Sequence, residues 1–169
     1  MLKFLIIIIK KVKLEFKIQR DKVDRPKYKI IPKSELKNKT KDILEKHDEI
    51  KLAYLFGSYA LNRQNKFSDI DIGLILDKSF KSDHLYFAEI ASKIEKKFNY
   101  TIEVDIKILN DLPPRFLFEV INHGIILHSI NKTFKNEFEL KVIKDYLDIK
   151  PLLDFFDQSY INEAFKDEN

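Results

Sequence analysis

The sequence predicts a small α/β (α+β) domain in which a mixed β-sheet is flanked by helices and followed by a helical C-terminus. Three observations lead to this prediction. Short runs of β-branched and aromatic residues alternate with amphipathic segments of helical period. A glycine, one of only three in 169 residues, ends one of these runs at Gly57. From Thr133 onward the pattern is helical, with an interruption expected near Pro151.

The elements follow one another in a simple order. A helix is expected after Ser34 as its N-cap, and a turn or two of helix is expected in "YALNRQ" after Gly57-Ser58. Further helices are expected over 82–98, over 115–123 before Gly124, and from 133 to the end. The segments expected to form strands are 51–56, 69–76, 101–109 and 125–130.

The N-terminal residues 1–33 are predicted to form an appendage, and residues 34–169 the main domain. "KVKLEFKIQ" alternates apolar and charged residues, which predicts a strand within 2–18. Residues 19–33 are charged and contain Pro26 and Pro32, which is typical of a linker.

Composition narrows the classes of function. The net charge is +4, but lysines alternate with Glu and Asp along the chain, so nucleic acid is not expected as a direct substrate. The chain has no cysteine, which excludes disulfides and cysteine-based zinc sites. The apolar run 4–9 is too short to span a bilayer. These features predict a cytoplasmic protein with no membrane partner.

Two aspartates interrupt the otherwise apolar strand "DIDIGLIL". Residues two apart on a strand share a face, so Asp69 and Asp71 lie together, opposite Ile70 and Ile72. Two carboxylates so close repel each other, and a divalent cation such as Mg²⁺ relieves that repulsion.

A third carboxylate would complete a two-metal site. Asp105 in "EVDIKIL" is the best candidate, and Glu103, on the same face, is its rival. Lys107 shares this face too; an exposed strand lysine is its default interpretation, and neutralising phosphate charge is the alternative.

Gly57-Ser58 supplies the complementary feature. A glycine turn between a strand and a short helix presents backbone N–H groups to an anion and lets a phosphate approach closely. The Ser58 hydroxyl can donate to a phosphate oxygen. A phosphate-binding turn beside a magnesium-binding pair indicates a nucleoside-triphosphate site.

In this order, "GSYALNRQNKFSDID" followed by Asp105 resembles the minimal nucleotidyltransferases (MNT) of the DNA polymerase β-like superfamily. The resemblance covers roughly residues 36–162 and implies the polymerase β-like fold. It implies that Gly57 and Ser58 contact the triphosphate, that Asp69 and Asp71 bind two Mg²⁺ ions, and that Asp105 binds the ion that activates the attacking oxygen. The family pattern has an arginine four residues after the glycine, where this chain has Leu61; Arg63 is the nearby candidate for nucleotide binding.

The resemblance also implies a function. Many such proteins are similar to antitoxins of HEPN/MNT toxin–antitoxin modules, which implies a protein adenylyltransferase that moves AMP from ATP to a tyrosine of a HEPN-domain toxin, with scope for a hetero-oligomer. Two alternatives remain: a non-catalytic antitoxin that blocks its partner by binding, and a nucleotidyltransferase for small molecules.

Overall fold

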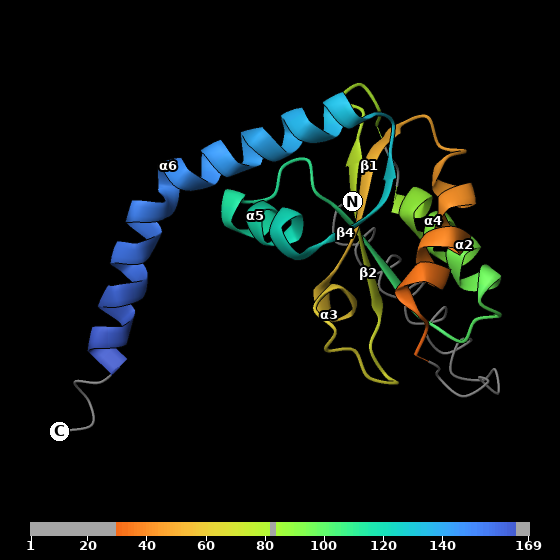
Figure 1. The fold of residues 1–169 in the computed structure, drawn as a ribbon, viewed down its shortest axis with the longest axis horizontal. Coiled ribbons are helices and arrows are strands. Elements are labelled where there is room, and N and C mark those ends of the chain that lie inside the picture. The colour runs from red at the N-terminus through yellow and green to blue at the C-terminus, as the bar shows by residue number, and fades with distance from the viewer. Residues whose placement is uncertain (1–29, 82–83, 165–169) are drawn as a thin grey trace, which may run out of the picture.

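The structure is a computed structural model that describes residues 30–81 and 84–164. The described residues form four strands and five helices, in the predicted order (Figure 1). The strands are β1 (Ile50–Phe56), β2 (Ile70–Leu76), β3 (Val104–Ile108) and β4 (Ile125–Ser129). The helices are α2 (Lys33–Leu44), α3 (Gly57–Ala60), α4 (His84–Lys97), α5 (Pro114–His123) and α6 (Lys132–Ala164).

The strands form one mixed sheet in the order β3-β2-β1-β4. β1 pairs antiparallel with both β2 and β4, whereas β2 and β3 run parallel. β1 and β2 are buried over most of their length because helices cover both faces, while the edge strand β3 alternates half-buried and exposed residues. The predicted mixed sheet with flanking helices is confirmed.

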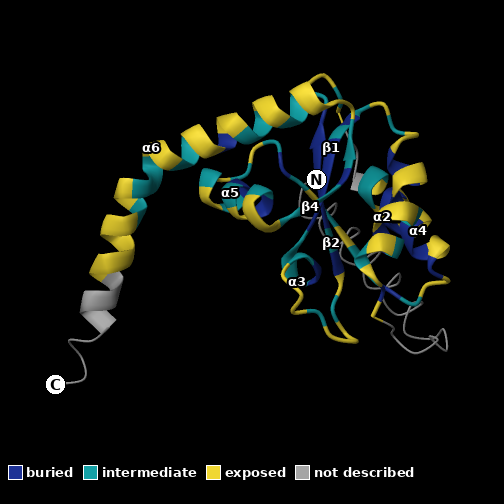
Figure 2. Cartoon of the chain, viewed as in Figure 1, coloured by how far each residue is buried: buried dark blue, intermediate teal, exposed yellow. Residues whose placement is uncertain are grey.

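Two hydrophobic clusters lie on opposite faces of the sheet. One packs α2 and α4 against Ile70, Ile72 and Leu74 of β2. The other packs α5 and α6 against Tyr54 of β1 and Ile75 of β2. Figures 1 and 2 show these helix pairs on the two sides of the buried strands. Since residues of β2 alternate between the clusters, every second side chain of this strand points to the α5–α6 face.

The first described helix begins two residues before the expected position. Pro32 is the N-cap of α2 and its carbonyl accepts from the Leu36 N–H at 3.0 Å, so Ser34 lies inside the first turn and its expected role as a cap is wrong. The helix buries Leu36, Thr40 and Leu44, and the Thr40 hydroxyl donates back to the Leu36 carbonyl at 2.8 Å.

The C-terminal helix α6 continues through Pro151, so the predicted interruption there is wrong. Figure 1 instead shows a bend in the helix, and an internal proline, which lacks the N–H of the helical ladder, is a common cause of such bends. Near its start α6 is tied to the sheet, because the Tyr54 hydroxyl donates to Glu139 at 2.8 Å. Tyr146 stacks on Phe118 of α5 at 4.1 Å between ring centroids.

The predicted N-terminal strand within 2–18 lies outside the described residues. Ile31, at the end of the proposed appendage, packs into the α2–α4 cluster with 4% exposure, and the division at residue 33 stays a prediction. Among the described helices, none is long and apolar enough to span a membrane.

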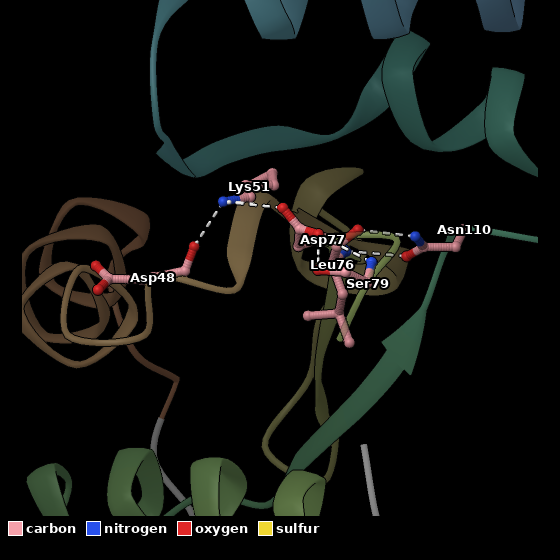
Figure 3. Close-up of polar contacts among 6 residues, drawn as sticks. All are labelled: Asp48, Lys51, Leu76, Asp77, Ser79 and Asn110. Atoms are coloured by element: carbon pink, nitrogen blue, oxygen red, sulfur yellow. Dashed lines mark hydrogen bonds and ion pairs between the residues drawn. The ribbon is translucent and has the colours of Figure 1, made fainter. Parts of the chain in front are cut away.

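At the C-terminal end of β2 a polar network holds the chain (Figure 3). The Asn110 side chain bonds the backbone of Leu76 twice, accepting from its N–H and donating to its carbonyl, both at 2.9 Å. Asp77 accepts from the Ser79 N–H at 2.9 Å and hydroxyl at 2.6 Å, and pairs with Lys51 at 3.3 Å. This network extends the β2–β3 pairing beyond the last strand residue.

Candidate active site

The register of the parallel pair places two of the predicted carboxylates side by side. Asp71 of β2 lies opposite Asp105 of β3, and adjacent strands are about 4.8 Å apart. Asp69 lies two residues before Asp71, just ahead of β2. Ile70 and Ile72 belong to the α2–α4 cluster, so Asp71 points to the other face, on the side of α5.

Gly57 lies against the same carboxylate. Its φ of +67° is in the left-handed region, which residues with a side chain rarely adopt. A Cβ at this position would stand 2.1 Å from Oδ2 of Asp71. Gly57 is therefore required both by its backbone conformation and by the space that Asp71 fills. The Gly-Ser turn and Asp71, which belong to separate motifs in the sequence, are therefore in contact in the structure.

The short helix α3 is held in place by a buried side chain and by a hydrogen bond at its C-terminal end. Tyr59 is buried with 1% exposure, and the Lys33 ammonium donates to the Ala60 carbonyl at 2.9 Å. With only four residues α3 has a weak macrodipole, so its contribution to anion binding is its N–H groups and Ser58. Within the described chain the Ser58 hydroxyl makes no hydrogen bond, and it is free to donate to a ligand.

The three carboxylates repel one another and lack compensating partners. Among the described residues, none of them accepts a hydrogen bond or forms an ion pair. Burial, followed by the charges of Glu103 and Asp105, raises the pKa of Asp69. Burial, followed by the charges of Asp105 and Asp69, raises the pKa of Asp71, and Lys107 partly opposes this. The site therefore concentrates negative charge that Lys107 compensates only in part.

The donor chemistry fits a hard divalent cation, because oxygen ligands and unrelieved carboxylate repulsion are what such an ion satisfies. The three carboxylates are not arranged to enclose an ion, however. Nowhere in residues 30–81 and 84–164 do three His, Asp or Glu side chains form a group that could hold a metal ion. The residues that would hold it are Asp69, Asp71 and Asp105, whose side chains would have to converge.

The remaining predicted residues are less closely tied to this centre. Arg63 is exposed, and its backbone N–H donates to the Ser58 carbonyl at 2.9 Å, but its guanidinium makes no polar contact within the described chain. Glu103, the rival of Asp105, acts on the pKa of Asp69. The strand register nevertheless sets Asp105, not Glu103, beside Asp71.

Lys107 is exposed on β3, as the default interpretation of this lysine predicted, but it also has a neighbour that the sequence did not indicate. Its ammonium lies 5.3 Å from the ring centroid of Phe116 on α5 and acts on the pKa of Asp71. The period-two pattern does place Lys107 on the face of Asp105. The position of α5 over that face had no signal in the sequence.

Comparison with known proteins agrees with this geometry. Residues 38–133 match the family model described as polymerase beta, nucleotidyltransferase. A Methanocaldococcus jannaschii protein, MJ1547, provisionally named a protein adenylyltransferase, is 38% identical over 87 residues. That match covers 51% of this chain and 57% of MJ1547, so this chain spans little more than half of its relative.

Solved structures show the same fold. A toxin–antitoxin crystal structure with AMP-PNP is 25% identical, has a TM-score of 0.59, and is matched over 76% of this chain and 98% of that one. A Shewanella oneidensis structure of a tri-AMPylated HEPN toxin in complex with MNT antitoxin has a TM-score of 0.56 at 23% identity, over 78% and 98% of the two chains. The chain belongs to the polymerase beta nucleotidyltransferase family.

Proposed function

We propose that this protein is a Mg²⁺-dependent protein adenylyltransferase that transfers AMP from ATP to a tyrosine of a HEPN-type toxin, and so acts as an antitoxin. The observation that carries the proposal is that Asp71 lies beside Asp105 in the strand register and against the Gly57 turn, with Asp69 two residues away. The structural relatives, described as toxin–antitoxin complexes, one with AMP-PNP and one with a tri-AMPylated HEPN toxin, support the choice of nucleotide and partner.

Each residue of the site has a role in this reaction. Gly57 leaves room for the Asp71 carboxylate, and Ser58 donates its hydroxyl to a phosphate oxygen of ATP. Asp69 and Asp71 hold the divalent cations, with Asp105 as the third ligand. Bound Mg²⁺ would supply charge neutralisation on the triphosphate and a lower pKa for the attacking hydroxyl.

The transfer needs no reactant besides ATP and the acceptor tyrosine. The tyrosine oxygen of the acceptor forms a bond to the α-phosphorus of ATP, and the bond from that phosphorus to the bridging oxygen breaks, which releases pyrophosphate. A tyrosine hydroxyl has a pKa near ~10 in water, so its proton must be removed. Asp105 is exposed on the edge strand, where it can accept this proton from an incoming protein.

The surface of α6 supports a protein acceptor over a small molecule. Exposed apolar side chains follow the helix on both sides of its proline, and monomeric proteins rarely leave such a run uncovered. They are Leu140, Ile143, Leu147, Leu152, Phe155 and Phe156, which are 37–67% exposed. A helix with this surface is suited to contact a partner chain.

The decisive experiment is transfer of label from α-labelled ATP, with Mg²⁺, to the product of the adjacent gene. We expect label on the partner with the wild type and none with Asp69→Asn or Asp71→Asn, and mass spectrometry then locates the modified tyrosine. Asp77→Asn is the matched control, since it makes the same change at the other end of β2, outside the site.

Other outcomes support the alternatives. A stable complex without labelled partner indicates an antitoxin that acts by binding alone. Consumption of ATP with a small acceptor and no partner present indicates a small-molecule nucleotidyltransferase. A thermal-shift titration with Mg²⁺ in the absence of nucleotide tests the metal ligands separately, and we expect stabilisation of the wild type but not of Asp71→Asn.

A further inference from the structure

The candidate site has an unbalanced charge that its ligand makes worse. Asp69, Asp71 and Asp105 are all carboxylates, and the triphosphate of ATP adds several negative charges. Divalent cations offset part of this charge, and phosphate-binding sites commonly add a fixed cationic side chain.

Lys107 meets the positional requirement. It follows Asp105 by two residues on β3, and both side chains are exposed, so they lie on the same face of the strand. The register sets Asp105 opposite Asp71 and Lys107 opposite Gly73, over which the Leu109 side chain packs. Lys107 thus lies two residues along β3 from Asp105, the residue that pairs with Asp71.

One aromatic ring lies against the lysine ammonium, and a second ring packs on the first. Its Nζ lies 5.3 Å from the ring centroid of Phe116 on α5, within the range of a cation–π interaction. Phe116 in turn packs edge to face on Phe56, with 5.7 Å between centroids. Phe56 precedes Gly57 and lies opposite Asp71 in the β1–β2 register. The aromatic pair therefore connects the lysine to the turn that forms the site.

The charge of Lys107 is also available. Within the described residues its ammonium forms no ion pair with a carboxylate, unlike Lys51, which pairs with Asp77. Of the three ionisable residues whose charges act on Asp71, Lys107 is the cation and the others are Asp105 and Asp69. Arg63 has no comparable link to the carboxylates.

We infer that Lys107 binds the β- and γ-phosphates of the nucleotide, with Phe116, itself packed on Phe56, holding its ammonium beside the carboxylates. This inference rests on the proposed nucleotidyltransferase function and names a phosphate-binding residue of the same site. Its role is to retain the triphosphate and to stabilise the charge of the departing pyrophosphate.

The test compares binding of two nucleotides, because AMP lacks the phosphates that Lys107 is inferred to contact. Isothermal titration calorimetry with Mg²⁺ measures AMP-PNP and AMP binding to the wild type, Lys107→Met and Lys107→Arg. We expect Lys107→Met to weaken AMP-PNP binding about tenfold or more, as for a lost charged partner, and to leave AMP binding unchanged. Lys107→Arg should retain most of the affinity.

Matched variants separate this role from a general effect of charge. Lys78→Met removes an exposed lysine just after the opposite end of β2 and should not change AMP-PNP binding. Phe116→Leu should weaken AMP-PNP binding less than Lys107→Met does, because it only loosens the ammonium. Circular dichroism and melting temperature establish that each variant is folded.

The inference is overturned if Lys107→Met binds AMP-PNP as the wild type does, or if it loses AMP and AMP-PNP equally, since a merely structural role would affect both. Failure of the proposed function is a different result. If the wild type labels no acceptor protein, the proposed transfer of AMP to a protein is wrong. The comparison of AMP-PNP and AMP binding still decides the role of Lys107.

Discussion

Strand β2 has aspartates at each end, and their surroundings at the two ends are opposite in kind. At its start, Asp71 and Asp69 lie near Asp105, and none of these three aspartates has a hydrogen bond or ion pair within the described residues. At its end, Asp77 accepts two hydrogen bonds from Ser79 and pairs with Lys51. Burial and like charges raise the pKa of Asp71. The bonds from Ser79 and Lys51 lower the pKa of Asp77 to about 2.

The difference separates a site from a structural contact. A carboxylate that stabilises the fold is surrounded by donors, as Asp77 is (Figure 3). A carboxylate kept among other carboxylates opposes folding and is explained by a ligand that the protein binds. The same residue type on one strand thus performs two tasks, and its neighbours determine which.

The largest expected effect comes from one substitution made at both ends. Asp71→Asn should reduce AMP transfer by about 100-fold or more, on the scale of losing one charge-stabilising group at a reacting centre. Asp77→Asn should leave the rate within a few-fold of the wild type, because it lies outside the site. Initial rates of label transfer measure the activity of both variants. Equal losses of rate in the two variants would contradict the distinction between the two ends of β2.

The next effect concerns the close contact between the turn and the carboxylate. Gly57→Ala places a Cβ 2.1 Å from Oδ2 of Asp71 and forces alanine to a φ of +67°. We expect a loss of about 1–3 kcal/mol in the free energy of unfolding from backbone strain, together with a large loss of transfer. Urea denaturation and the transfer assay measure these. Ser58→Ala, which adds no atoms, should lower transfer without the loss of stability, and a stable, active Gly57→Ala variant would contradict the fitted contact.

At the structural end of β2, the expected effect is on stability alone. Asn110→Ala leaves the N–H and carbonyl of Leu76 without their partner at 2.9 Å. A loss of about 1–3 kcal/mol in the free energy of unfolding is expected from these unsatisfied groups, with transfer unchanged below the melting temperature. Asn38→Ala on the exposed surface of α2 is the control, for which urea midpoints should move little.

The smallest effect is a difference in pH dependence between the two ends. The lowered pKa of Asp77 means that its ionised form stabilises the fold above its ordinary pKa of 3.8, and that this stability is lost as the pH falls toward about 2. Asp77→Asn should therefore melt at a lower temperature than the wild type at pH 7, with the gap closing in acid.

The raised pKa of Asp71 has the opposite sign, because its ionised form opposes folding above the pKa of the unfolded chain. Without metal or nucleotide, Asp71→Asn should melt at a higher temperature than the wild type at pH 7, and this gap also should close in acid. Melting curves in EDTA from neutral pH down to about 2 measure both variants, and shifts of the same sign at neutral pH would contradict the comparison.

The sequence by itself determined the order of elements and the mixed sheet, and it predicted which acidic residues form the candidate site. Local patterns carry this information, because alternation over 69–76 defines a strand and the same period places Asp69 and Asp71 on one face. Prediction from the sequence failed where the local signals were weak. The sequence favoured Ser34 as the N-cap, but Pro32 is the N-cap and the helix begins at Lys33. It also favoured a break at Pro151, but α6 continues through this residue.

Only the tertiary structure decided how these residues meet. The parallel register that sets Asp105 beside Asp71 joins segments separated by a whole helix, and no local pattern specifies it. The contact of Gly57 with Asp71 and the placement of Phe116 beneath Lys107 likewise depend on how β1 and α5 pack on the sheet. Residue type and period are properties of a short segment, whereas proximity between distant segments is fixed by packing, and the candidate site depends on that proximity.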